Sequence, residues 1–332
     1  MVLLEVRDLK MYYRAFGGWI RAVDGISFEL ERGSTLGLVG ESGCGKSSVG
    51  LSLLKLLPPT AKFMSGEILF DGTDLLNLCP EDIRKIRWKR ISMIFQNAMN
   101  ALDPVKKVGD QLMEALTVNV NVRKDEAKKK AVELFERVGL SADRMNSYPH
   151  ELSGGMKQRV IIAMALVCNP ELIIADEPTT ALDVVVQDQI MQLILELKEK
   201  FNLSIIFISH SASVIAETCE RICVMYGGKI VEQADVRSIF KSPYHPYTIS
   251  LFYSYPSIVG EVKKLISLPG APPNLLNPPA GCRFAPRCPI AKKVCKAEEP
   301  PKFEVKKGHY SHCHFAMELD VRKIQSMLEG LT

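Results

Sequence analysis

The feature that most constrains this chain is a glycine-rich loop between an apolar strand and a helical stretch. Residues 40–47 read GESGCGKS, follow the apolar run of residues 34–39 and precede a leucine-rich stretch. Phosphate binding needs backbone N–H groups at a helix N-terminus, glycines at tight positions, a lysine for the outer phosphates and a hydroxyl for Mg²⁺. All these parts are present, which predicts a P-loop that binds ATP or GTP rather than an inert glycine turn. The residues expected around the nucleotide are Gly40, Ser42, Gly43, Cys44, Gly45, Lys46, Ser47 and Ser48.

Length, charge and hydropathy limit the remaining function classes. The chain has 332 residues, of which 47% are apolar, so one large domain or two can form a packed core. Its net charge of +4 is small, and its most basic run, residues 123–130, is interrupted by two acids, so no nucleic-acid partner is expected. The longest uncharged apolar run near the middle, residues 160–168, is too short to span a bilayer, and the N-terminus has no signal-peptide pattern. We expect a cytoplasmic chain that reaches a membrane only through partners.

The order of apolar patterns predicts an α/β fold in two domains. Residues 2–39 alternate short strands with turns, and residues 67–70 and 91–95 have strand character, while residues 125–138 have helical periodicity. The continuous apolar runs 172–175 and 205–208 are typical of buried parallel strands, and a helix at 184–200 between them would complete a βαβ unit. From about residue 235 prolines become frequent, which favours a small irregular second domain. We therefore place the domains at residues 1–234 and 235–332.

Two neighbouring carboxylates follow the apolar run of residues 172–175. A strand end is where a P-loop enzyme holds its Mg²⁺-binding aspartate. Because adjacent strand residues point in different directions, Asp176 can serve the metal while Glu177 faces a water near the γ-phosphate as general base. Alone, the pair would more simply be two solvated acids.

A second helix start with exposed glycines precedes this strand. Residues 152–156 read LSGGM, in which Ser153 is a natural N-cap and Gly154 and Gly155 leave backbone N–H groups accessible to a phosphate. Such a segment alone is usually only a helix cap. Its position between the P-loop and the carboxylate strand favours a second anion site.

In this order and spacing, the motifs resemble those of the ATP-binding cassette (ABC) family, the ATPase subunits of ABC transporters, over residues 2 to about 234. The resemblance implies a P-loop NTPase cassette with a RecA-like core, an N-terminal antiparallel β subdomain and a helical signature subdomain. It identifies residues 40–47 as Walker A, Asp176 as the end of Walker B, Glu177 as the catalytic glutamate and LSGGM as the signature, with Met156 where glutamine is more usual.

The family's remaining sites also have counterparts. Gln96 resembles the Q-loop glutamine that touches Mg²⁺, Asp183 the D-loop aspartate, and His210 the switch histidine at the γ-phosphate, followed by Ser211 where aspartate is common. Tyr13, rather than Tyr12, resembles the aromatic residue that stacks on adenine. The implied catalytic residues are Glu177, His210, Gln96 and Lys46, and the implied Mg²⁺ ligands are Ser47, Gln96 and Asp176.

The resemblance also implies how the chain would work. Two cassettes close head to tail on two ATP molecules, so that Ser153, Gly154 and Gly155 contact the nucleotide of the partner chain. Lys46 and the loop amides then neutralise the β,γ oxygens during hydrolysis.

Three segments after residue 235 narrow the resemblance. Residues 241–248 (KSPYHPYT), 268–273 (LPGAPP) and 281–289 (GCRFAPRCP) resemble the C-terminal extension of ATPase subunits from dipeptide and oligopeptide importers. This implies integral-membrane permease partners, a second ATPase subunit that is a related distinct chain, and indirectly an extracytoplasmic peptide-binding protein. From the residues alone, HPY reads as a turn that starts a helix.

Four cysteines gather in this proline-rich extension. Cys282, Cys288, Cys295 and Cys313 have the spacing C-x5-C-x6-C-x17-C, and four thiolates suit either zinc or an iron–sulfur cluster. Because no C-x2-C pair of a zinc ribbon is present, we favour a [4Fe–4S] cluster over Zn²⁺, as the resemblance also does. His309, His312 and His314 surround Cys313 and could replace it as a ligand, and four unliganded thiols remain the simplest alternative.

The sequence thus favours the ATP-hydrolysing subunit of a peptide importer at the cytoplasmic face of a membrane. One alternative is a soluble ABC-type ATPase with an Fe–S domain that acts in repair, translation or cluster assembly. Another is a redox-responsive module in which the cysteine domain is the functional part. The transported solute itself is not encoded in this chain.

Overall fold

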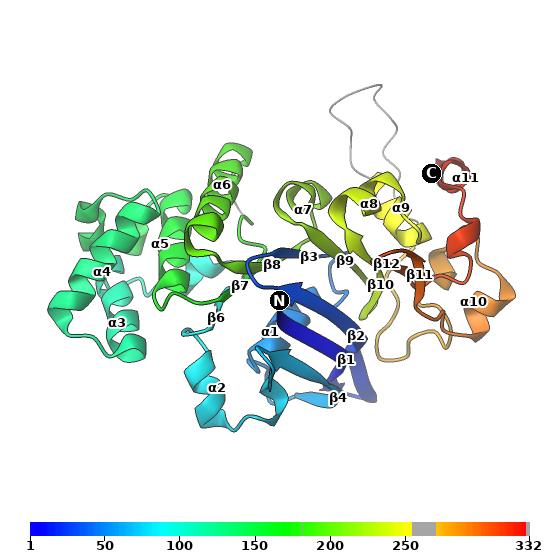
Figure 1. Ribbon diagram of the computed structural model, residues 1–332, viewed down its shortest axis with the longest axis horizontal. Coiled ribbons are helices and arrows are strands. Elements are labelled where there is room, and N and C mark those ends of the chain that lie inside the picture. Colours follow the sequence, from blue (N-terminus) through cyan, green and yellow to red (C-terminus); the bar gives the residue numbers. More distant parts are fainter. Residues whose placement is uncertain (181, 254–269, 330–332) are drawn as a thin grey trace. The chain divides into compact units, whose positions relative to one another are not determined.

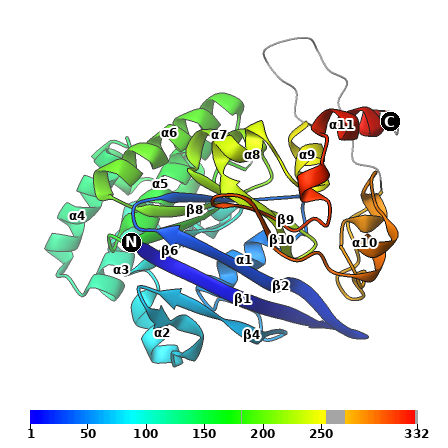
Figure 2. The same cartoon turned by 45° about the vertical axis from the view of Figure 1, so that its right-hand side comes forward.

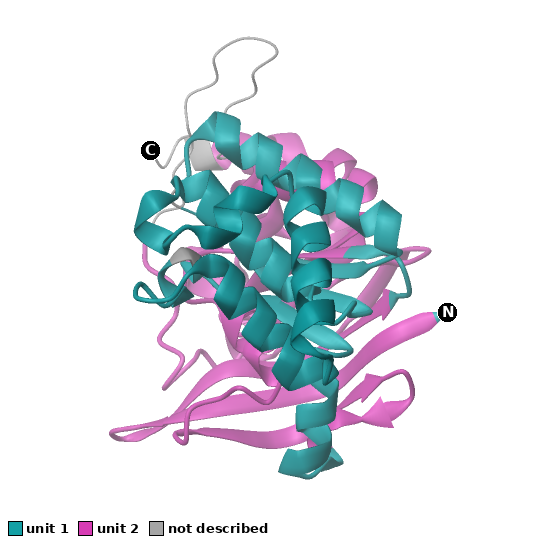
Figure 3. Cartoon of the chain, turned by 90° about the vertical axis from the view of Figure 1, so that its left-hand side faces the viewer, with its two compact units in different colours: residues 1, 31–35, 77–207 teal, residues 2–30, 36–76, 208–332 magenta. Residues whose placement is uncertain are grey.

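The computed structural model describes residues 1–180, 182–253 and 270–329 of the chain. These residues form two compact units (Figure 3): residues 1, 31–35 and 77–207 form the first, and residues 2–30, 36–76 and 208–332 the second. Leu268 and Pro269 of the LPGAPP segment lie outside the described residues. In the described part of the chain, no helix is both long and apolar enough to cross a membrane.

The first unit contains the predicted βαβ segment. Strand β6 (Ile91–Ile94) pairs in parallel with β7 (Leu172–Asp176), with Ile91 opposite Leu172. Helix α6 (Val184–Phe201) follows β7 and precedes β8 (Ser204–Ser209), most of which also lies in this unit. All residues of β7 and β8 are buried, which explains why their sequences are continuous apolar runs instead of alternating ones. The predicted strands and connecting helix are confirmed.

A group of helices completes the first unit (Figure 1). Helices α3 (Val108–Val120), α4 (Lys124–Arg137) and α5 (Gly154–Leu166) pack against one another. The helix predicted at residues 125–138 is confirmed as α4, and its apolar face, which carries Ala131 and Phe135, is fully buried. The shorter helical elements of this unit are α2 (Pro80–Ile86), η2 (Ala98–Ala101), η3 (Ala142–Asn146) and η4 (Pro149–Glu151).

The second unit begins with an antiparallel sheet in the order β2-β1-β4-β5, and Figure 2 shows β1, β2 and β4 side by side. Its strands are β1 (Val2–Ala15), β2 (Gly18–Glu31), β4 (Ala61–Phe70) and β5 (Thr73–Asp74). Both β1 and β2 are longer than the short strands that the sequence predicts. A register shift between Arg7 and Lys10 interrupts the apolar alternation of β1, although the strand continues through it.

A second set of strands in this unit carries the P-loop, in the order β11-β12-β10-β9-β3. Strand β3 (Thr35–Val39) pairs in parallel with β9 (Arg221–Tyr226), and β10 (Lys229–Asp235) is antiparallel to β9. The C-terminal strands β12 (His309–Ser311) and β11 (Phe303–Lys306) continue the sheet beyond β10. The extension therefore lies in the same unit as the P-loop, and its strands extend the sheet to which the P-loop strand belongs.

The helices of the second unit are mostly short. They are α1 (Lys46–Leu53), η1 (Leu75–Asn77), α7 (Ala212–Thr218), α8 (Val236–Lys241), α9 (Pro246–Tyr253), η5 (Ala285–Arg287), α10 (Lys293–Ala297), η6 (Ala316–Glu318) and α11 (Val321–Glu329). None of the described helices after residue 235 exceeds nine residues, as the proline-rich sequence predicts. Helix α9 begins at Pro246, so the HPY segment does start a helix.

Candidate nucleotide site

Backbone crowding explains two glycines of the phosphate-binding loop. A Cβ atom at Gly40 would lie 2.1 Å from the carbonyl oxygen of Met225, and one at Gly45 would lie 2.1 Å from that of Ala22. Gly45 also has a φ of +108° and caps α1, which begins at Lys46. Only glycine fits at both positions, and the loop therefore leads directly into the N-terminus of α1. At its apex, Ser42 and Gly43 are exposed and accessible to a ligand.

The lysine of the loop lies inside it. Lys46 is 6% exposed, and its Nζ donates hydrogen bonds to the carbonyl oxygens of Gly40 (2.7 Å) and Glu41 (3.0 Å). Cys44 Sγ lies 3.7 Å from the same Nζ, and burial raises the pKa of the Cys44 thiol. The ammonium group is thus held at the loop that would receive the outer phosphates, and Ser47 follows it in the first turn of α1.

Two adjacent tyrosines of β1 have different partners. The hydroxyl of Tyr13 lies 3.1 Å from Ser48 Oγ in α1, whereas the hydroxyl of Tyr12 donates to Asp24 Oδ1 at 2.6 Å. Tyr13 therefore contacts the P-loop helix, and Tyr12 contacts β2. This arrangement favours Tyr13 over Tyr12 as the aromatic neighbour of a nucleotide base.

The first unit brings two of the predicted catalytic residues into contact. Asp176 closes β7 and is 3% exposed, and Glu177 follows it with a φ of +47°, a conformation that costs a non-glycine residue on the order of 1 kcal/mol. Glu177 Oε2 accepts hydrogen bonds from Gln96 Nε2 (2.8 Å) and Thr180 Oγ1 (3.0 Å). Two donors thus fix the orientation of the Glu177 carboxylate.

Thr180 is a site residue that the sequence analysis missed. Its hydroxyl is three positions from Glu177 and holds the same oxygen as Gln96. The sequence does place a hydroxyl residue in the turn after the two carboxylates. Such residues are common in turns, however, because their hydroxyls bond to nearby backbone groups, so the position alone does not indicate a site residue.

The predicted cap of the signature segment is confirmed. Ser153 Oγ accepts a hydrogen bond from the backbone N–H of Met156 (3.3 Å) at the start of α5, and Ser153 and Gly154 are exposed. A Cβ atom at Gly155 would lie 2.8 Å from Val186 Cγ1, so a glycine there permits close packing of α5 and α6. The exposed Ser153 and Gly154 therefore lie where a group from outside the chain can reach the start of α5.

The remaining predicted residues lie at element ends. Asp183 is the N-cap of α6, where its Oδ1 accepts from the N–H of Val186 at 2.9 Å, a structural role that the sequence analysis did not foresee. His210 is exposed directly after β8.

All four C-terminal cysteines line one pocket. Cys282, Cys288, Cys295 and Cys313 face it together with His245 and His314. Burial raises the pKa of Cys282, and it raises the pKa of Cys288 and of Cys313 to about 12, so these thiols are neutral at physiological pH unless a metal binds them. Among the residues that the structure describes, however, no three His, Cys, Asp or Glu side chains come together closely enough to hold a single metal ion.

Zinc and a four-iron cluster place different geometric demands on four cysteines. Zn²⁺ binds each sulfur at roughly 2.3 Å, so its four ligands must converge on one point. A four-iron cluster does not require that convergence, because each cysteine ligates a different iron.

A P-loop between β3 and α1, a carboxylate pair at the end of β7 and a capped glycine start of α5 together define an ATP-binding cassette ATPase. Comparisons with known proteins agree. A family model described as ABC transporter matches residues 23–180, and a model of the oligopeptide/dipeptide transporter C-terminal region matches residues 231–295. The chain belongs to the family of ATP-binding proteins of oligopeptide and dipeptide ABC transporters.

Individual relatives are similar along nearly the whole chain. The probable peptide ABC transporter ATP-binding protein y4tR of Sinorhizobium fredii is 48% identical over 94% of each chain. The oligopeptide transport ATP-binding protein OppD of Bacillus subtilis is 49% identical over 93% of this chain and 87% of its own. Among solved structures, the ATP-binding cassette MJ0796, determined as a dimer in a post-hydrolysis state with ADP and Pi, superposes with a TM-score of 0.63 at 28% identity, over 70% of this chain and 99% of its own.

Proposed function

We propose that this chain hydrolyses ATP to power the uptake of dipeptides or oligopeptides through a membrane ABC transporter, on whose cytoplasmic face it sits. Both the cassette and the peptide-transporter extension are present in one chain, and relatives that share more than nine-tenths of its length are named as peptide-transport ATP-binding proteins. The observation that carries the hydrolytic part is the Glu177 carboxylate, fixed by Gln96 and Thr180 beside the buried Asp176. The soluble-ATPase alternative is not favoured by these relatives.

The residues of the site divide the chemistry among them. Lys46 and the loop amides would neutralise the β,γ-phosphate oxygens. Ser47, Gln96 and Asp176 are the residues that would hold Mg²⁺, whose charge would offset the negative charge that develops on the phosphate oxygens. Glu177 would orient and deprotonate the attacking water, with its carboxylate already fixed by two hydrogen bonds.

Several roles concern groups outside this chain. Ser153 and Gly154 are exposed, and Gly155 follows them in the first turn of α5. The three residues suit contact with the nucleotide of a partner cassette in a head-to-tail dimer. We propose a related distinct ATPase chain as that partner, integral-membrane permease subunits as the driven elements, and an extracytoplasmic peptide-binding protein as the indirect source of substrate. His210 would contact the γ-phosphate, and Asp183 would lie at the contact between the two cassettes. The functional boundary between cassette and extension would lie between residues 234 and 235.

The cysteine pocket supports a cofactor proposal. Four thiols of the extension line one pocket, and four cysteine thiolates are the ligand set of a [4Fe–4S] cluster. We infer that Cys282, Cys288, Cys295 and Cys313 hold a [4Fe–4S] cluster, which would bind the segments of the extension together. No step of ATP hydrolysis passes through it.

Replacement of the general base tests the proposed function. Glu177→Gln should retain MgATP binding, because the amide keeps the shape and one hydrogen-bond acceptor, while turnover falls by roughly 10² or more. In cells that depend on this transporter, wild type should restore uptake of a labelled tripeptide and Glu177→Gln should not. Glu196→Gln, an exposed carboxylate change in α6, is the matched control and should behave as wild type. Normal turnover by Glu177→Gln would refute the assignment, and peptide uptake without this chain would refute its transport role.

A further inference from the structure

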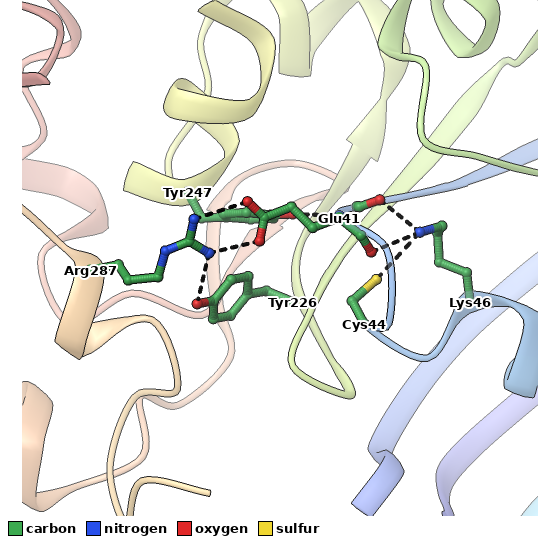
Figure 4. Close-up of polar contacts among 7 residues, drawn as sticks. Glu41, Cys44, Lys46, Tyr226, Tyr247 and Arg287 are labelled. Carbon is green, nitrogen blue, oxygen red and sulfur yellow. Dashed lines mark hydrogen bonds and ion pairs between the residues drawn. The ribbon is translucent and has the colours of Figure 1, made fainter. Parts of the chain in front are cut away.

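One residue of the phosphate-binding loop is held by the C-terminal extension (Figure 4). The Glu41 carboxylate accepts two hydrogen bonds from the guanidinium of Arg287, with Nη1–Oε2 at 2.7 Å and Nη2–Oε1 at 3.0 Å. The backbone N–H of Glu41 donates to the hydroxyl of Tyr247 at 2.9 Å. Both the side chain and the backbone of this loop residue are therefore tied to residues that lie more than 200 positions later.

The side chains that reach the loop are themselves rigidly held. Tyr226, Tyr247 and Phe284 form a buried aromatic cluster, with ring centroids 4.6 to 5.5 Å apart. The Arg287 side chain is 6% exposed and also donates to the Tyr226 hydroxyl at 3.3 Å. Bidentate contact between a planar guanidinium and a carboxylate fixes geometry as well as charge. Arg287 can thus act as a fixed clamp.

Electrostatics explain why such a clamp matters for the nucleotide. The carboxylate of Glu41 belongs to a loop built to receive a highly negative triphosphate, and an uncompensated negative charge there would repel it. The backbone carbonyl oxygen of the same residue accepts from Lys46 Nζ at 3.0 Å, so Glu41 directly contacts the lysine that ATP needs. Arg287 neutralises Glu41 and keeps its side chain turned toward the extension, away from competition for Lys46.

We propose that Arg287 is a positioning residue of the nucleotide site, which sets ATP affinity by neutralising and anchoring Glu41 of the phosphate-binding loop. The extension then contributes directly to ATP binding. Because Arg287 acts on binding, its loss affects KM and Kd for ATP more than kcat at saturating ATP.

A charge-removal cycle tests this proposal. Arg287→Ala should raise the Kd and KM for MgATP roughly tenfold or more, the scale expected for loss of a charge-assisted contact, with kcat within about threefold of wild type. Glu41→Gln should have a smaller effect, and adding it to Arg287→Ala should recover most of the lost affinity, because no unpaired carboxylate remains. Arg287→Lys keeps the positive charge but cannot make the bidentate contact, so its Kd for MgATP should lie between those of wild type and Arg287→Ala. Arg237→Ala, an exposed arginine of α8, is the matched control.

The double variant separates positioning from folding. If Arg287 served only to fold the extension, Glu41→Gln would not rescue its loss, and that result would overturn the proposal. A Kd for Arg287→Ala within twofold of wild type would also overturn it. Should Arg287→Ala not fold, Arg287→Lys takes its place in the cycle. The ATP affinities of wild type, Arg287→Lys, Glu41→Gln and the double variant are then compared, and equal affinities of these four proteins would reject the proposal. Equilibrium binding of ATP needs no turnover, so this test remains valid if the hydrolytic assignment of Glu177 fails.

Discussion

At the scale of single residues, the two tyrosines of β1 give a direct test of base recognition. Successive strand residues point to opposite faces, so Tyr13 meets Ser48 of the P-loop helix while Tyr12 meets Asp24. Tyr13→Ala should raise the Kd for ATP by roughly tenfold, the scale of one lost aromatic stack on a base, whereas Tyr13→Phe should keep most of the affinity. Equilibrium dialysis with labelled ATP measures both.

The neighbouring tyrosine provides the control. Tyr12→Phe removes a hydroxyl of the same kind from the adjacent position and should leave the Kd for ATP unchanged. If Tyr12→Ala instead weakened ATP binding and Tyr13→Ala did not, the assignment of the two residues would be reversed.

The residue scale also separates what the sequence could and could not predict. The P-loop was predictable because its working parts are contiguous, and the capping role of Ser153 because an N-cap acts on the next few residues. The contact of Glu41 with Arg287 joins positions 246 apart, and no local pattern in either segment specifies it. Asp183 was predicted as a family site residue, yet its hydrogen bond caps its own helix.

At the scale of secondary structure, the sequence predicts best those helices and strands whose burial follows one regular pattern. Strands β7 and β8 are buried throughout and α4 has one buried face, so their sequences carry a clear period. The helix start at Pro246 was likewise predictable from the turn chemistry of HPY. The burial of Tyr247 in that helix and its contact with the P-loop were not, since they depend on tertiary packing.

A second arginine of the extension ties it to β2 and gives a stability prediction. Arg283 donates to Asp24 in a buried ion pair, with both side chains less than a tenth exposed. Asp24→Asn should lower the free energy of unfolding by roughly 3 to 5 kcal/mol, because it leaves the buried guanidinium without its counter-ion. Urea titration measures this loss, and Glu29→Gln, an exposed change in the same strand, should cost little.

The pH dependence of this loss follows from the pKa of Asp24. Burial alone would raise that pKa, but the hydrogen bond from Tyr12 and the charge of Arg283 hold it below its ordinary value of 3.8. A depressed acid pKa stabilises the folded state fully above the unfolded pKa and loses this contribution as pH falls through the folded one. The difference between wild type and Asp24→Asn should therefore be constant from pH 5 to pH 8 and shrink below about pH 4. A difference that grew on acidification would contradict the pairing.

At the scale of the whole molecule, the prolines and cysteines predicted an irregular extension but not where its strands pair. Strands β12 and β11 add to β10 in the sheet that contains β3. Arg283 precedes the turn η5 and Arg287 ends it, and both lie between the pocket residues Cys282 and Cys288. A proline-rich sequence predicts only that long helices and strands are absent. It does not predict which strand a short segment will pair with, because that pairing depends on a few backbone hydrogen bonds. Within its unit, the extension is thus bound to the P-loop segment through both backbone and side chains.

The cofactor proposal gives the last prediction. Protein purified without oxygen should absorb broadly near ~400 nm and contain about four iron atoms per chain, because thiolate-to-iron charge transfer colours a Cys-held [4Fe–4S] cluster. Cys288→Ser should lose both signals, while Cys168→Ser, a partly buried cysteine outside the pocket, should keep them. Since Arg287 directly precedes Cys288, cluster loss should also raise the KM for ATP. Zinc in place of iron would reject the cluster, and absence of any metal would leave the four thiols as packing residues.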